Sequence, residues 1–324
     1  MQDFKGKVAV ITGAGSGIGR ELTRQLVHEG CGAAICDLDN VGMEETLRLC
    51  REDNPDNALV TGFVCDVADE DQVQQFVEDT RIQHDSAHID ILINNAGING
   101  GGSFVESSRE EWDRAFNICW SGVYLVTRNF FPMLKASNEG HLVNMSSANA
   151  IRAVLGGHVP HTAYSTAKFA VRGFSEALIH DFRFNAPHLS VSVVMPGHTG
   201  TDIISNSLKV LGQNTPDSWS TNEIELTKRR WKIAGQPNVD AMSEDDVRAA
   251  GIREIQNMKE LGLPAAEAAK IILDGVKRKQ WRILIGSDTT TLDHLVRDSP
   301  ETAYDPDFVT RWQKANAKYL NSDD

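Results

Sequence analysis

The sequence has few cysteines, and those it has follow no metal-binding or disulfide pattern. There are five in 324 residues, an odd number, and none of them form a CxxC pair. This excludes a zinc knuckle and a disulfide framework. We therefore expect buried thiols in a reducing, cytoplasmic compartment. The five positions are Cys31, Cys36, Cys50, Cys65 and Cys119.

Long apolar runs and an excess of positive charge are also absent. No apolar stretch reaches the roughly 18 residues that a membrane span needs, and an expected strand at 7–11 leaves no space for the core of a signal peptide. Lys and Arg number 32 against 45 Asp and Glu, a net charge of −13. We therefore expect neither nucleic acid nor a membrane as a partner. The basic run at 228–232 is interpreted as a solvated helix face.

What the chain does contain is a regular alternation of apolar and amphipathic segments. The apolar segments are rich in Val and Ile without a period of two, which is typical of parallel strands buried on both faces. Amphipathic segments between them predict an α/β fold, a doubly wound parallel sheet of seven strands with helices on both faces. The expected strands are 8–11, 33–36, 59–64, 89–93, 142–145, 191–194 and 281–285, and the clearest helices are 20–28, 43–51, 72–83 and 164–184.

The alternation is interrupted at 203–263, after the sixth expected strand. This position over the carboxyl edge of the sheet favours a helical substrate lid, with a packing or subunit-contact insertion as the alternative. Ser243 and Asp246 predict a capping box at the start of one of its helices. The segment also carries Trp219 and Trp231, which suggest a sizeable apolar substrate.

Regular structure resumes with an expected helix at 264–280, opened by Pro264, before the seventh strand. The tail, 287–324, is expected to contain one helix near 292–296 followed by coil. The whole chain, 1–324, is interpreted as a single domain with these appendages.

A glycine-rich turn joins the first expected strand to the first helix. Glycines at such a junction let the backbone approach a pyrophosphate, and the helix N-terminus offers free N–H groups and a partial positive charge. The strand and helix context favours a dinucleotide site over a turn without a ligand. The candidate residues are Gly13, Gly15, Ser16, Gly17, Ile18 and Gly19.

The ends of the next strands carry residues suited to the adenosine half of a dinucleotide. Asp37 follows the second expected strand, where a carboxylate can accept both ribose hydroxyls and repel a 2′-phosphate. Neither Ser16 nor Leu38 is a basic residue that would bind that phosphate, so NAD is favoured over NADP. Asp66 and Val67 can bracket the adenine amino edge, with a helix N-cap as the alternative for Asp66.

The fourth expected strand ends in Asn94-Asn95-Ala96-Gly97. Small residues there allow close approach of the cofactor, and the amides can tie neighbouring strands together. A simple turn is the alternative.

A tyrosine and a lysine stand four residues apart at the start of the longest expected helix. That spacing places Tyr164 and Lys168 on one face, and an ammonium beside a tyrosine favours the phenolate, so the pair is a candidate general acid and base. Ser146 and Ser147 end the fifth strand, where a hydroxyl faces the ligand crevice. Asn117 is expected to be buried and to hold a water that relays protons to Lys168. For the Tyr164 and Lys168 pair, the structural alternative is an ordinary amphipathic helix face. For the two serines it is a strand-end turn, and for Asn117 it is a hydrogen-bonded core amide.

Together these motifs resemble the short-chain dehydrogenase/reductase family. The resemblance covers about residues 5–202 in order, and 264–297 is similar to a branch of bacterial secondary-alcohol dehydrogenases. The matching residues are the TGxxxGxG turn at 12–19, Asp37, Asp66, the NNAG run at 94–97, Asn117, Ser147, the YxxxK pair Tyr164 and Lys168, and Pro196-Gly197 with Thr201.

The resemblance implies a Rossmann-type fold and NAD(P)-dependent interconversion of an alcohol and a carbonyl. It also implies a homodimer or homotetramer formed through the helices 110–131 and 163–184. It assigns acid/base catalysis to Tyr164, the nicotinamide ribose and the tuning of Tyr164 to Lys168, substrate orientation to Ser147 rather than Ser146, and the proton relay to Asn117. The carboxamide end of the nicotinamide is assigned to Pro196, Gly197, Thr199 and Thr201.

Two segments depart from the family pattern. The gap from Ser147 to Tyr164 is longer than in many relatives and is expected to line the substrate pocket. The turn after Pro196 contains His198, which is positioned to touch substrate or pyrophosphate. A metal site is not expected, because these loop histidines lack carboxylate ligands at a suitable spacing. The residues concerned are Gly156, Gly157, His158, His161, His198 and Gly200.

These observations predict an NAD-dependent oxidoreductase that interconverts a secondary alcohol and a ketone. A sugar-nucleotide epimerase or dehydratase also uses a YxxxK pair, but the glycine spacing and the small C-terminal part disfavour it. The alternative from another class is a non-catalytic NAD-binding sensor or scaffold. Such a protein would have no physical need for Asn117, Ser147, Tyr164 and Lys168 together.

Overall fold

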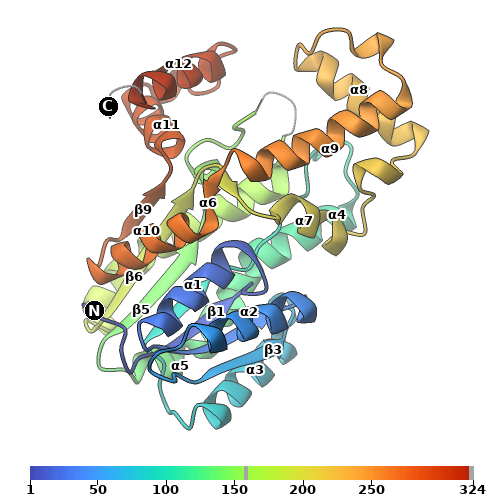
Figure 1. Ribbon diagram of the computed structural model, residues 1–324. Coiled ribbons are helices and arrows are strands. Elements are labelled where there is room, and N and C mark those ends of the chain that lie inside the picture. The colour runs from blue at the N-terminus through green and yellow to red at the C-terminus, as the bar shows by residue number, and fades with distance from the viewer. Residues whose placement is uncertain (157–159, 321–324) are drawn as a thin grey trace.

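Seven parallel strands form the central sheet in the computed structural model, which describes residues 1–156 and 160–320 (Figure 1). The strand order is β3-β2-β1-β4-β5-β6-β9, so the chain winds outward in both directions from β1 and β4. The doubly wound sheet and all seven expected strands are confirmed. The strands are β1 (Val8–Thr12), β2 (Gly32–Asp37), β3 (Val60–Val64), β4 (Ile91–Asn94), β5 (Gly140–Met145), β6 (Leu189–Pro196) and β9 (Arg282–Ile285).

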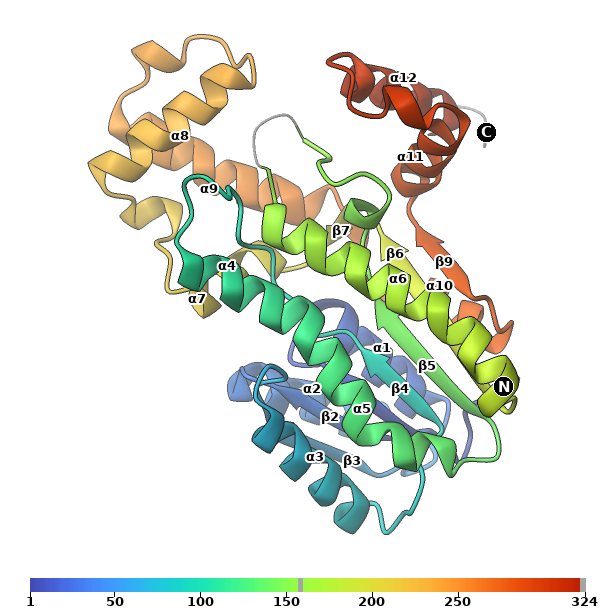
Figure 2. The ribbon, with the colours of Figure 1, turned by 180° about the vertical axis from the view of Figure 1, so that it is seen from behind.

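Helices cover both faces of this sheet, because successive side chains of a strand point to opposite faces. Ile11 of β1 packs in a core with α1, α2 and α10, whereas its neighbour Val10 packs in a second core with α3, α5 and α6. Figure 2 shows the second of these helical layers in front of the sheet. The helices are α1 (Gly17–His28), α2 (Asn40–Glu52), α10 (Ala265–Lys277), α3 (Glu70–Gln83), α4 (Arg109–Phe116), α5 (Gly122–Lys135) and α6 (Thr162–Asn185).

The strand β3 departs from the predicted burial on both faces. It is half-buried along most of its length, and Val64 is 57% exposed. Its position explains the difference, since β3 lies at the edge of the sheet and pairs only with β2. A run of Val, Thr and Phe predicts a strand without predicting whether that strand is central or at an edge.

The stretch between β6 and α10 contains three α-helices, of which the second and third share a small core of their own. They are α7 (Ile203–Val210), α8 (Thr221–Ile233) and α9 (Glu244–Glu260). Trp231 is 6% exposed and packs with Ile224, Val247 and Trp219 inside this insertion. The argument from the two tryptophans to an apolar substrate is therefore wrong, because they stabilise the insertion itself.

The ends of the insertion are joined by a short two-stranded sheet, and the predicted capping box is present within the insertion. The short strand β7 (Thr199–Gly200) pairs with β8 (Leu263–Pro264), so the chain leaves and re-enters the sheet region at one place. The capping box at α9 is confirmed, since Ser243 accepts from the Asp246 amide while the Asp246 carboxylate accepts from the Ser243 amide at 3.0 Å. The basic run lies on α8, as expected for a helix face.

The C-terminal tail contains more helix than predicted. The expected helix near 292–296 is α11 (Ser287–Asp298), but a further helix, α12 (Phe308–Leu320), replaces the expected coil. Figures 1 and 2 show the tail and the insertion above the same end of the sheet, on opposite sides of it.

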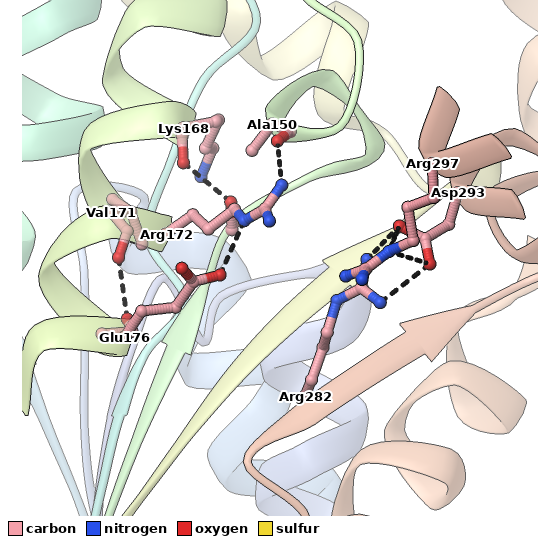
Figure 3. A network of polar contacts seen from close by, with 10 residues as sticks. Ala150, Lys168, Val171, Arg172, Glu176, Arg282, Asp293 and Arg297 are labelled. Atoms are coloured by element: carbon pink, nitrogen blue, oxygen red, sulfur yellow. Dashed lines mark hydrogen bonds and ion pairs between the residues drawn. The ribbon is translucent and has the colours of Figure 1, made fainter. Parts of the chain in front are cut away.

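An ion-pair network anchors α11 to β9 (Figure 3). Asp293, only 5% exposed, accepts hydrogen bonds from Arg282 of β9, one of them at 2.8 Å, and from Arg297 at 3.0 Å. Burial by itself raises the pKa of the Asp293 carboxyl, but the hydrogen bonds from Arg282 and Arg297 outweigh it and hold that pKa below its usual value.

All five cysteines are buried and free, as predicted. Burial raises the pKa of the Cys50 thiol to about 11, which keeps it protonated near neutral pH. None of the helices in the described part of the chain combines the length and the apolar character that crossing a membrane requires.

Replacing the anchoring carboxylate should destabilise the fold. We expect Asp293→Asn to lower the free energy of unfolding by about 3 kcal/mol, because two arginines lose their buried counter-ion. A carboxyl with a depressed pKa contributes stability above its unfolded value, about 3.9, and loses the contribution as the pH falls through the folded pKa. Denaturant unfolding at pH 7 and at pH 3 measures both effects. The difference in the free energy of unfolding between wild type and Asp293→Asn should be smaller at pH 3 than at pH 7. The control Asp298→Asn, on the exposed end of the same helix, should have the stability of the wild type at both pH values.

Candidate active site

A cavity of about 350 Å³ lies along the carboxyl ends of β1, β2, β3 and β4. The parallel arrangement brings these strand ends to one edge, where ligands bind in doubly wound sheets. Most of the predicted cofactor-binding residues line it, together with residues of α7 that the sequence did not single out. The lining includes Gly13, Ser16, Gly17, Ile18, Asp37, Leu38, Asp66, Val67, Asn95, Ala96, Gly97, Ile98, Ile118, Thr201, Ile203, Asn206, Lys209 and Val210.

The glycine turn leaves the N-terminus of α1 open to the cavity. Gly13 has a φ of +66°, and a Cβ there would lie 2.6 Å from the Ala96 Cα, so no side chain fits. Ser16 makes no side-chain cap, and no acidic residue lies in the first helical turn. The free N–H groups and the helix dipole can therefore bind an anion. Gly15 and Gly19 lie behind the lining, packed against Asp37 and the Gly13 carbonyl.

The carboxylate of Asp37 lines the cavity at the end of β2. It accepts hydrogen bonds from the Gly15 amide at 2.8 Å and from the Asp39 amide at 2.9 Å, which hold it at the end of β2. The nearby Arg20 points away from this position, since its guanidinium donates to the Gly15 carbonyl and its Nε to Thr46. Arg20 therefore forms no ion pair with the Asp37 carboxylate.

Asp66, at the end of β3, is held by the Ala68 amide at 3.0 Å and by an ion pair with Arg114 of α4 at 2.7 Å. The N-cap alternative for Asp66 is wrong, because Asp69 caps α3 through the Gln72 amide. Asp66 therefore faces the cavity without serving a helix end.

The NNAG run ties two strand ends together, as the amides suggested. Asn95 donates through Nδ2 to the carbonyls of Thr12 and Gly13, at 3.0 and 2.9 Å. The Thr12 hydroxyl accepts from the amides of Asn95 and Ala96. These hydrogen bonds hold the glycine turn against the end of β4, where both segments line the cavity.

Lys168 is buried beside Tyr164, and neither residue is among those that line the cavity. Its ammonium, on a residue only 4% exposed, donates to the Met145 carbonyl at 2.8 Å and lies 5.5 Å from the centre of the Tyr164 ring. A Cβ on Gly97, which lines the cavity, would lie 3.4 Å from the same nitrogen. The structure therefore places a buried positive charge between the tyrosine and the cofactor cavity.

The two serines at the end of β5 point in different directions. The Ser146 hydroxyl donates to the Lys168 carbonyl at 2.8 Å, so it is engaged with the backbone of α6. The Ser147 hydroxyl accepts from the Asn149 amide at 3.1 Å at the start of a short 3-10 turn. This difference supports Ser147, rather than Ser146, as the hydroxyl that can turn toward a substrate.

The burial predicted for Asn117 is wrong. The residue is exposed, and its Oδ1 accepts from the Ser121 hydroxyl at 3.2 Å. Asn117 begins a π-helical turn, Asn117–Ser121, between α4 and α5, and the wider turn changes which side chains face inward. Cys119 takes the inward position: it is buried, donates to the Ile98 carbonyl at 3.2 Å, and lies near Gly97. Helical spacing alone could not show this change of phase.

The turn after β6 meets the cavity through Thr201 only. Gly197 packs against Asp288 and Thr289 of α11, while Thr199 belongs to β7, and Pro196 ends β6. Thr201 lies against Gly17 of the glycine turn. Of the residues expected to bind the carboxamide end of the nicotinamide, the structure therefore places only Thr201 at the cavity.

The described histidines of the two unusual segments, His161 and His198, contact different parts of the structure. His198 donates through Nε2 to the Met258 carbonyl of α9 at 2.6 Å, so it ties the turn to the insertion. His161 lies edge-on to the Tyr164 ring at 6.4 Å between ring centres. His158 and Gly157 lie outside the described residues. Within those residues no group of three or more potential ligands of the His, Cys, Asp or Glu type could hold a metal ion.

The insertion helix α7 covers the cavity from above. Ile203, Asn206 and Val210 lie on its inner face, and the Asn206 amide donates to the Ser16 hydroxyl at 3.1 Å. Ser207 accepts from the Asn99 amide at 2.8 Å, which fastens the helix to the loop after β4. Lys209 adds a cation to the same lining.

The comparisons with known proteins agree with this geometry. A family model described as short chain dehydrogenase matches residues 7–210. A Mycobacterium tuberculosis protein named as an oxidoreductase, SadH, is 32% identical over 298 residues, 92% of each chain. Levodione reductase of Leifsonia aquatica is 31% identical over 225 residues, 69% of this chain and 80% of its own.

Solved structures show the same fold. A short-chain dehydrogenase/reductase from Burkholderia phymatum, in complex with NAD, superposes with a TM-score of 0.72 at 25% identity, covering 94% of this chain and 98% of the other. The fold and the site thus define an oxidoreductase of the kind that binds a nicotinamide cofactor. The chain belongs to the short-chain dehydrogenase/reductase family.

The cation on α7 gives a first test of the cavity. We expect Lys209→Met to weaken NADH binding about tenfold, because a charge-assisted contact with the pyrophosphate is lost. Fluorescence titration with NADH measures the dissociation constant. Lys270→Met, which removes an exposed lysine of α10 outside the cavity, should bind NADH as the wild type does. Equal affinity of the two variants would contradict a phosphate contact.

Proposed function

We propose that the protein interconverts a secondary alcohol and a ketone with NAD as its cofactor. The observation that carries this proposal is the buried Lys168 ammonium beside Tyr164, close to Gly97 of the cavity lining. A buried cation that donates to a neutral carbonyl rather than to a carboxylate keeps its full charge available to a neighbouring phenolate. That arrangement suits a tyrosine that must gain and lose a proton.

The proposed chemistry assigns one task to each residue. Bound NAD or NADH accepts or supplies the hydride. In oxidation the Tyr164 phenolate takes the hydroxyl proton of the alcohol, and in reduction the Tyr164 hydroxyl gives a proton to the carbonyl oxygen. Ser147 holds that oxygen with its hydroxyl, and Lys168 stabilises the phenolate and binds the nicotinamide ribose.

The preference for NAD rests on Asp37. Its carboxylate is held in the cavity by two backbone amides and suits the two hydroxyls of an adenosine ribose. A 2′-phosphate would meet this negative charge, and Arg20 is engaged with the backbone of the glycine turn. Both facts favour NAD over NADP.

The substrate is proposed to be apolar near its carbonyl. Phe104 and Val105 are 78% and 90% exposed in the loop that precedes α4. The same loop accepts hydrogen bonds from the Thr162 and Ala163 amides at the start of α6, directly before Tyr164. Arg229 of α8 pairs with Glu106 at 3.5 Å, so the insertion contacts this loop. These contacts support the proposal that residues 203–263 form the substrate lid.

The protein is further proposed to be a homodimer or homotetramer. The helices α5 and α6 run along the outside of the sheet (Figure 2), and α6 exposes Phe169 at 41% and Phe184 at 80%. Apolar side chains on an outer helix suit a contact with a second copy.

The acid/base assignment is tested by Tyr164→Phe. NADH oxidation is first measured against ketones graded by size, with NADPH in parallel. We expect turnover with NADH in the wild type and a loss of at least about 100-fold in kcat in the variant, because proton transfer by a positioned group contributes that much. The affinity for NADH should not change. Retained turnover would overturn the role of Tyr164, and NADH binding without turnover of any substrate would favour a sensor or scaffold.

The cofactor preference is tested by Asp37→Ser. We expect the ratio of kcat/KM with NADPH to that with NADH to rise about tenfold or more, because the variant no longer repels the 2′-phosphate. Steady-state kinetics with both cofactors measure the ratio. Asp56→Asn, at an exposed carboxylate paired with Lys5, is the matched control. Faster turnover with NADPH than with NADH in the wild type would contradict the argument.

A further inference from the structure

The C-terminal tail lies against the segment that follows the catalytic strand β5. Ala148, Ala150 and Ile151 pack in one apolar cluster with Leu292 of α11 and Phe308 of α12. The contact is polar as well as apolar, and its polar part involves the side chain of Arg152 and the backbone of Ala153.

Arg152 is a buried cation held by the tail. The residue is 7% exposed, and its Nε donates to the Ala303 carbonyl at 2.6 Å. The guanidinium lies over the rings of Tyr304 and Phe308, 5.1 and 4.7 Å from their centres. Burial lowers the pKa of this guanidinium. Its recorded partners are thus a carbonyl and two aromatic faces rather than a carboxylate, and all of them come from the tail.

The backbone of Ala153 connects the tail with residues next to Ser147 and Tyr164. Its N–H donates to the Tyr304 hydroxyl at 3.0 Å. Its carbonyl accepts from Asn149 Nδ2 at 3.1 Å and from the Ser165 hydroxyl at 2.5 Å. The backbone N–H of Asn149 in turn donates to the Ser147 hydroxyl. Ser165 is the residue after Tyr164. The backbone N–H and C=O of Ala153 therefore connect the tail with the loop of Ser147 and with the start of the helix of Tyr164.

The side of the segment that faces the sheet is held independently. Arg172 of α6 donates to the Ala150 carbonyl at 2.9 Å and pairs with Glu176 at 2.8 Å (Figure 3). The tail itself is fixed at its base by Asp293 and Arg282. The segment 147–153 is thus held by α6 on one side and by the tail on the other, and the tail is itself bound to β9.

We propose that the tail is a positioning element of the active site, in which Tyr304 and Arg152 fix the segment 147–153 so that Ser147 and Tyr164 face the same point. This inference rests on the proposed function for its kinetic consequence, but the contacts themselves exist without a substrate. A shift of a catalytic group by a fraction of an ångström lowers the rate of the chemical step more than it lowers cofactor binding.

The test removes only the hydroxyl that contacts Ala153. We expect Tyr304→Phe to lower kcat for reduction of the ketone about fivefold, while the melting temperature and the dissociation constant for NADH stay unchanged. Tyr124→Phe, at the exposed tyrosine of α5, is the matched control and should behave as the wild type. Arg152→Met, which removes the cation from both rings, should lower kcat at least as far.

A double variant separates positioning from general loss of packing. If Tyr304 acts through Ser147, Tyr304→Phe should have no further effect on kcat once Ser147→Ala is present. Effects that multiply in the double variant would overturn the proposal, and so would a Tyr304→Phe variant with the kcat of the control.

Hydrogen exchange gives a readout that needs no substrate. Peptides covering 147–153 should exchange faster in Tyr304→Phe than in Tyr124→Phe, and equal exchange would overturn the proposal. If the wild type turns over no substrate, the proposed function fails, and the exchange result alone then decides whether the tail holds this segment.

Discussion

The site depends on one constraint: parallel strands in register must end at the same edge of the sheet. Because β1, β2, β4 and β5 run side by side, their ends place groups from distant parts of the sequence at one edge. These groups are the glycine turn, Asp37, the NNAG run and Ser147. The hydrogen bonds between Asn95 and the glycine turn then hold two of these strand ends together. Lys168 binds to β5 through the Met145 carbonyl, so the catalytic helix is placed by the same edge.

The two appendages use that edge differently. The insertion contributes α7 to the cover of the cavity and fastens it with Asn206 and Ser207, while its tryptophans build a separate small core. The described part of the tail, residues 287–320, contributes nothing to the cavity lining and instead contacts the segment that follows Ser147. One appendage therefore lies over the cavity, and the other lies against the segment that begins with Ser147.

Much of the fold could be predicted because the signals are local. A short run of Val and Ile specifies a buried strand, and a glycine turn between strand and helix specifies a phosphate-binding geometry, without information from elsewhere in the chain. The prediction was wrong where a local pattern has more than one tertiary outcome. The run of β3 does not tell an edge strand from a central one, and the spacing around Asn117 does not reveal a π-helical turn. The helix α12 was missed because its apolar residues find their partners in the distant segment 148–151.

By itself the sequence determined the order of the strands and helices and the residue types available to each strand end, because these depend on periodicity and on neighbours within a few positions. The tertiary structure decided which groups meet. It turned Ser146 toward α6 and Ser147 toward Asn149, exposed Asn117, packed the two tryptophans within the insertion, and brought Tyr304 to Ala153. Each of these outcomes depends on packing between segments far apart in the chain, and no local pattern of residues contains that information.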